Sequence, residues 1–177
     1  HIKPPGELAY GRVDTAACLA RCVDHLLALR PAPDVVLMTG DLVDAGAPEE
    51  YAHLRRLIAP LGMPVYLIPG NHDDRETLRA GFPEHGYLHT GGGFLHYTVE
   101  DGPLRLVGLD TLVPGAVHGE LCAARLTWLE ARLDEAPERP TLVFMHHPPF
   151  DTGIAGMDRY RCRGGDALGA LIERHTQ

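Results

Sequence analysis

Short apolar runs alternate along the chain with longer segments in which apolar residues recur every three or four positions. Continuous apolar runs predict strands buried on both faces, and they occupy 34–39, 65–68 and 141–145. Two further runs flank Asp101-Gly102, a pair that predicts a hairpin turn between 94–99 and 104–109. Helical spacing occurs in 14–30, 48–61, 74–80, 120–133 and 166–174. Because strands and helices alternate without a linker between them, we expect one α/β domain over residues 1–177.

Composition narrows the possible partners. The chain has 177 residues and a formal net charge of -8, which disfavours binding to nucleic acid or to an anionic membrane surface. No apolar run approaches the length of a membrane span. The 4 cysteines form no CxxC pair, so we expect reduced thiols in a cytoplasmic protein.

Polar side chains follow the three buried runs, each at the point where the run ends. Asp41 comes after Gly40, Asn71 after Gly70, and His146 directly after Met145. In open α/β sheets, the carboxyl ends of the strands are where binding sites are built. His1 is expected to end a fourth strand of this kind, whose body would precede it in a longer protein.

Oxygen and imidazole donors without a cysteine favour Mn, Fe, Zn or Co ions over a structural zinc site. A carboxylate between two cations can bridge them, and Asp41 is the candidate for that role. His72 is expected to act beside the metals, as an acid–base or orienting group. We expect supporting roles in the loops for Asp44 and Asp73, and a structural role for His147. The other histidines that we considered are expected on the surface or in loops: His53, His85, His89, His96 and His118.

Three blocks of the sequence carry a resemblance to a known family. Gly40-Asp41-Leu42-Val43-Asp44, Gly70-Asn71-His72-Asp73 and Met145-His146-His147-Pro148 resemble successive blocks of the calcineurin-like metallophosphoesterase superfamily. That superfamily also has an early Asp-x-His block, whose histidine His1 fits, and a late Gly-His-x-His block, which is absent here. The resemblance implies a four-layer α/β/β/α sandwich with a dinuclear metal centre, truncated here at both ends.

Within the superfamily, the chain is most similar to the class III cyclic nucleotide and glycerophosphodiester phosphodiesterases. The likeness rests on Ile2-Lys3-Pro4, on the segments 48–51 and 67–74, and on 144–149. By motif position it implies the following roles. His1 binds the first metal, Asp41 bridges, Asn71 and His146 bind the second metal, and His72 contacts the phosphate or the leaving group.

The resemblance also implies a function. We expect a phosphodiesterase with two divalent metal ions (Mn, Fe, Zn or Co) that hydrolyses a small-molecule phosphodiester, either a 3',5'-cyclic nucleotide or a glycerophosphodiester. The attacking group would be a hydroxide that bridges the metals. Alternatives are a phosphomonoesterase or a nuclease on the same scaffold, or a non-catalytic binding scaffold. A homo-oligomer, dimer or larger, is also implied.

Overall fold

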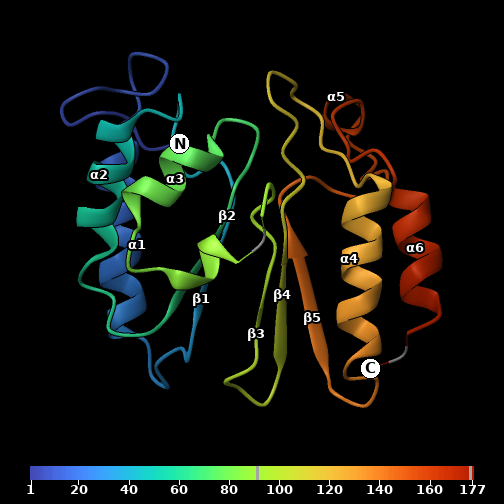
Figure 1. Cartoon of the computed structure of the whole chain (residues 1–177). Coiled ribbons are helices and arrows are strands. Elements are labelled where there is room, and N and C mark those ends of the chain that lie inside the picture. The colour runs from blue at the N-terminus through green and yellow to red at the C-terminus, as the bar shows by residue number, and fades with distance from the viewer. Residues whose placement is uncertain (91, 176) are drawn as a thin grey trace. The chain divides into compact units, whose positions relative to one another are not determined.

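The computed structural model describes residues 1–90, 92–175 and 177, and it divides into two compact units, His1–Gly86 and Tyr87–Gln177 (Figure 1). A single domain over residues 1–177 stays a prediction. None of the helices in these described residues has the length and apolar character needed to cross a membrane.

The first unit is built on two parallel strands with helices beside them. Its elements in chain order are α1 (Thr15–Ala28), β1 (Val36–Thr39), α2 (Pro48–Ile58), β2 (Val65–Ile68) and α3 (Arg75–Gly81). The strands pair from Val36↔Val65 to Thr39↔Ile68, and α2 forms the crossover between them. This βαβ connection places both strand ends, and the loops that follow them, at one edge of the sheet.

Local sequence explains where these helices begin. The Asp14 carboxylate accepts the Ala17 N–H at 2.8 Å at the start of α1, and the Asp74 carboxylate accepts the Thr77 N–H at 2.8 Å at the start of α3. Proline 48 opens α2, where a missing N–H costs nothing. Burial then stabilises these helices, because α2, α3 with its C-cap residue, and β2 contribute fully buried side chains: Tyr51, Leu54, Leu67, Ile68, Leu78 and Phe82.

The second unit is built on a three-stranded sheet. Its described elements are η1 (Gly86–His89, which begins at the last residue of the first unit), β3 (Tyr97–Val99), β4 (Arg105–Leu109), α4 (Ala123–Asp134), β5 (Thr141–Met145), α5 (Ala155–Asp158) and α6 (Gly165–Glu173). The strand order is β3-β4-β5, with β3 antiparallel to β4 as the hairpin signal predicts, and β4 parallel to β5.

The helices α4 and α6 lie side by side in Figure 1 and share a core with β4 and β5. Its buried members are Val107, Leu109, Leu121, Leu129, Leu133, Cys162, Leu168 and Leu171. The sheet therefore holds β5, and the turn that follows it, against a packed layer of helices.

Three details differ from the sequence-based expectation. Helix α4 begins at Ala123, and Arg125 is buried on it, where it donates to the Leu112 carbonyl at 2.6 Å. His96 was expected at the surface or in a loop; it lies in the loop directly before β3 but is buried, with its ring stacked on Trp128 at 4.8 Å between centroids. The short helices η1 and α5 lie where the pattern predicted no helix, because single turns of 4 residues carry little periodic signal.

The four cysteines are free thiols, and we expect the buried one to react more slowly than the other three. Burial raises the pKa of Cys162 to about 12, so this thiol is protonated as well as inaccessible near neutral pH. Although partial burial opposes it, the Arg125 hydrogen bonds and charge lower the pKa of Cys122. We expect iodoacetamide at pH 7.5 to modify Cys18, Cys22 and Cys122 in the folded protein, and Cys162 only after denaturation, as read by peptide mass spectrometry. Native labelling of Cys162 at the rate of exposed Cys18 would contradict this assignment.

Candidate metal centre

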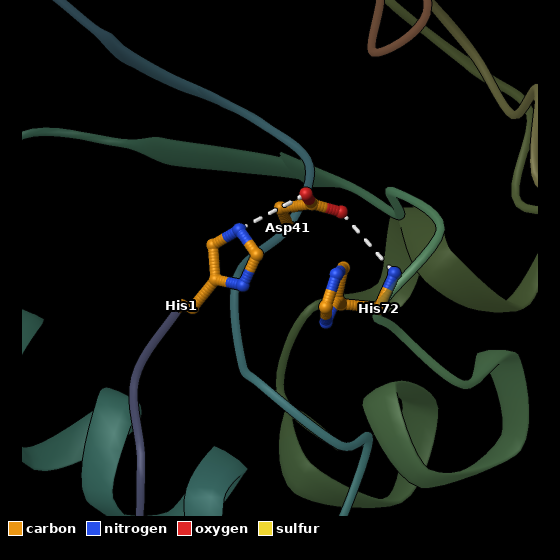
Figure 2. Close-up of side chains that lie close together, drawn as sticks. All are labelled: His1, Asp41 and His72. Carbon is orange, nitrogen blue, oxygen red and sulfur yellow. Dashed lines mark hydrogen bonds and ion pairs between the residues drawn. The ribbon is translucent and has the colours of Figure 1, made fainter. Parts of the chain in front are cut away.

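Three side chains from distant parts of the first unit lie together: His1 at the start of the chain, Asp41 in the loop after β1, and His72 in the loop after β2 (Figure 2). One ligand atom of each lies within 4.8 Å of the others. One Asp41 carboxylate oxygen is 3.1 Å from His1 Nε2, and the other accepts the His72 backbone N–H at 3.2 Å. A parallel bridge between Ile2 and Val43 holds the chain after His1 beside this loop.

The turn after β1 has a backbone conformation that suits few residues. Gly40 has a φ of 92° and Asp41 a φ of 50°, so two successive residues are in the left-handed region. Glycine adopts this region without penalty, and aspartate is among the side chains that tolerate it best. The turn delivers the Asp41 carboxylate to the His1 and His72 rings, and such backbone outliers cluster at functional sites.

Asp44 organises both histidines. The His72 Nδ1 lies 2.6 Å from the Asp44 backbone carbonyl, and because a carbonyl oxygen only accepts, Nδ1 is the donor. The Asp44 carboxylate faces His1 Nδ1 at 3.6 Å and accepts a hydrogen bond from Lys3 Nζ at 2.6 Å. That hydrogen bond raises the pKa of Lys3, which keeps the ammonium charged. This contact is how Asp44 could play the supporting role predicted for it. It holds His72 by Nδ1, so the other ring nitrogen, Nε2, points away from Asp44.

Asp73 fastens the two ligand loops together. Its carboxylate accepts the N–H groups of Leu42 at 3.0 Å and Gly70 at 2.8 Å, and the Tyr51 hydroxyl at 2.9 Å. Burial raises the pKa of Asp73 even though these hydrogen bonds act in the opposite direction. Burial also raises the pKa of Tyr51, which keeps its hydroxyl protonated as a donor. One buried carboxylate thus sets the spacing between the loop of Asp41 and the loop of His72.

The two remaining predicted ligands have different positions. Asn71 is half-buried in the turn after β2, directly before His72. His146 is half-buried in the second unit, directly after β5, with its ring edge-on to His147 at 4.7 Å between centroids. The structure thus brings together His1, Asp41 and His72 in the first unit and describes His146 within its own unit.

The residues of the cluster fit a divalent metal ion. The His1 imidazole and the Asp41 carboxylate are donors that first-row transition metals accept, and the His72 ring lies beside them. Two atoms bound to one ion at about 2.1 Å lie about 3 Å apart at a right angle, and His1 Nε2 and the Asp41 oxygen are 3.1 Å apart. All three residues are partly exposed, which leaves a path for the ion.

Sequence reasoning missed one feature of this site, the tether between the Asp44 carbonyl and His72. The block Gly40-Asp41-Leu42-Val43-Asp44 showed that two aspartates share a loop, but it carried no signal for a backbone contact 28 residues away. The order of side chains in a sequence cannot reveal this contact, because the acceptor is a backbone carbonyl, which every residue has.

Comparison with known proteins agrees with this geometry. A family model for calcineurin-like phosphoesterases matches residues 11–175, and the chain belongs to that family. It is 40% identical over 178 residues to the glycerophosphodiester phosphodiesterase GpdQ of Enterobacter lignolyticus. It is 36% identical over 165 residues to the 3',5'-cyclic adenosine monophosphate phosphodiesterase CpdA of Pseudomonas aeruginosa.

The match covers nearly all of this chain but only part of those relatives. It spans 98% of the chain and 63% of the Enterobacter protein, and 93% of the chain and 58% of the Pseudomonas protein. Among solved structures, a dimetal phosphatase from Danio rerio superposes with a TM-score of 0.71 at 16% identity, over 93% of this chain and 69% of that one. The α/β fold of the metallophosphoesterase type, expected from the sequence blocks, is thereby confirmed.

Proposed function

We propose that the protein is a dinuclear metal-dependent phosphodiesterase that hydrolyses a small phosphodiester. The observation that carries this proposal is the cluster that His1 forms with Asp41 and His72, which lie in the loops after two parallel strands. The full ligand set in the proposal is His1, Asp41, Asn71 and His146, with Asp41 as the bridging carboxylate. We include Asn71 and His146 in this set because each follows a buried strand and each stands in one of the blocks that resemble the family.

Two bound divalent ions would supply a nucleophile from water at neutral pH and would neutralise charge on the phosphoryl oxygens. The chain's own residues determine the geometry around them. Asp44 holds His72 by Nδ1–H, so only a doubly protonated His72 ring could donate a proton, from Nε2, to a phosphoryl or leaving-group oxygen. Lys3 balances the Asp44 charge at 2.6 Å and leaves Asp41 as the carboxylate that faces the ions.

The substrate classes in the proposal are glycerophosphodiesters and 3',5'-cyclic nucleotides, which the names of the relatives above support. Both are small diesters with one negative charge at phosphorus, and the metal ions would neutralise it in an otherwise acidic protein. The native metals in the proposal are drawn from Mn, Fe, Zn and Co. We further propose that the active form is a cytoplasmic homo-oligomer.

The test is hydrolysis of bis(p-nitrophenyl) phosphate by the full-length parent protein, after chelation and again after addition of Mn²⁺. We expect the chelated protein to be inactive, Mn²⁺ to restore turnover, and Asn71→Ala to remove most of it. His89→Gln, at an exposed histidine of η1, is the matched control and should keep the activity of the parent protein. Parallel assays with p-nitrophenyl phosphate separate a phosphomonoesterase from a diesterase. Folded protein that stays inactive with Mn, Co, Zn and Fe would favour the binding scaffold instead.

A further inference from the structure

His147 follows the proposed ligand His146 directly, and the proposed reaction leaves it without a role. Its side chain is 3% exposed. Nδ1 lies 2.7 Å from the Thr111 hydroxyl, and Nε2 lies 3.2 Å from the Val117 carbonyl. Because the carbonyl only accepts, Nε2 carries the proton, and in the neutral ring Nδ1 accepts from the Thr111 hydroxyl. The ring therefore ties both ends of the segment 111–117 to the end of β5.

The backbone of Gly119 also contacts the His147 side chain. A methyl group at Gly119 would overlap Nδ1, Cγ and Cβ of His147, so the backbone there packs directly on the ring. The Gly119 carbonyl accepts the Arg163 N–H at 2.8 Å, and the Pro148 carbonyl accepts the Cys162 N–H at 2.9 Å. Three segments of the second unit thus meet around one buried imidazole.

The same imidazole contacts His146. The two rings are edge-on, with centroids 4.7 Å apart and planes at 82°. Because Thr111, Val117 and Gly119 fix the His147 ring, it presents a fixed surface to the His146 ring. A metal-binding histidine gains affinity when neighbouring groups fix the orientation of its ring.

We propose that His147 is a positioning residue: together with Thr111 it fixes the His146 ring, and the segment 111–119 beside it, in the orientation that binds metal. This inference rests on the proposed function, because it takes His146 as a ligand. The Thr111 hydroxyl is the part of this arrangement that can be tested. It can be removed without changing the size of the side chain and without mutating a proposed metal ligand.

The experiment measures Mn²⁺ alone, by equilibrium dialysis and atomic emission, on the chelated full-length parent protein and its variants. Thr111→Val keeps the shape and removes the hydroxyl, and we expect it to weaken one bound Mn²⁺ about tenfold or more while the other ion is retained. Thr111→Ser restores the hydroxyl and should restore the second ion. His147→Gln removes the ring and the Nδ1 acceptor, and it should behave like Thr111→Val. Circular dichroism establishes that each variant is folded.

The matched control is Thr127→Val on the exposed side of α4, which should bind Mn²⁺ as the parent protein does. If folded Thr111→Val and His147→Gln bind both ions with unchanged affinity, the inference is overturned and the proposed function stands. A parent protein that binds two ions but hydrolyses no phosphate ester overturns the proposed function, while the binding data still decide the role of His147. Failure of the parent protein to bind Mn²⁺ would overturn both.

Discussion

Asp41→Asn is expected to lower hydrolysis of bis(p-nitrophenyl) phosphate by about a thousandfold or more, with little change in the fold. A metal ion contributes several kcal/mol to stabilising transition-state charge, and about 4 kcal/mol corresponds to a thousandfold in rate. Asparagine keeps one oxygen to accept the His72 N–H, and it tolerates the φ of 50° at this position. The substitution therefore removes the negative charge and a ligand oxygen without straining the turn.

The measurements are kcat/KM at saturating Mn²⁺ and the Mn²⁺ content after dialysis. Asp34→Asn, at an exposed acid in the loop before β1, makes the same change in net charge and should retain full activity. A folded Asp41→Asn protein with activity within tenfold of the parent would exclude Asp41 as a bridging ligand.

Asp73→Ala is expected to lower the free energy of unfolding by about 3–5 kcal/mol. The substitution leaves the N–H groups of Leu42 and Gly70 and the Tyr51 hydroxyl without their buried acceptor, and each such group costs about 1–3 kcal/mol. Burial of the Asp73 carboxylate is itself unfavourable, as its raised pKa shows, so its removal offsets part of this loss in stability.

Urea unfolding in the presence of a chelator measures this effect without any contribution from bound metal. Tyr51→Phe removes only one of the three donors and should cost about 1–2 kcal/mol, whereas the exposed Asp101→Ala should change stability by less than about 0.5 kcal/mol. A loss below about 1 kcal/mol for Asp73→Ala would show that the two ligand loops keep their spacing without this carboxylate.

Much of the fold was predictable because its signals are local. The continuous apolar runs predicted β1, β2 and β5, and the aspartates at positions 14 and 74 marked the starts of α1 and α3. The hairpin between β3 and β4 followed from Asp101-Gly102. The candidate site was predictable for the same reason, because Asp41 and Asn71 each directly follow a glycine at the end of a predicted strand.

The burial of two polar residues was not predictable. His96 and Arg125 are both buried, each against an aromatic ring. Their burial depends on Trp128 and Phe94, which approach only after the helix and the sheet have packed. Residue type alone does not contain that information.

The sequence by itself determined the α/β class, the places where strands end, and the identity of the polar residues that follow them, because periodicity and turn chemistry act over a few residues. Only the tertiary structure decided which atoms meet: the Asp44 carbonyl with His72 Nδ1, the Asp73 carboxylate with donors from three segments, and the His147 ring with Gly119. These contacts join residues 3 to 31 positions apart in the chain, and several of them use backbone groups. Packing of the whole core brings such groups within reach, so no local pattern in the sequence specifies them.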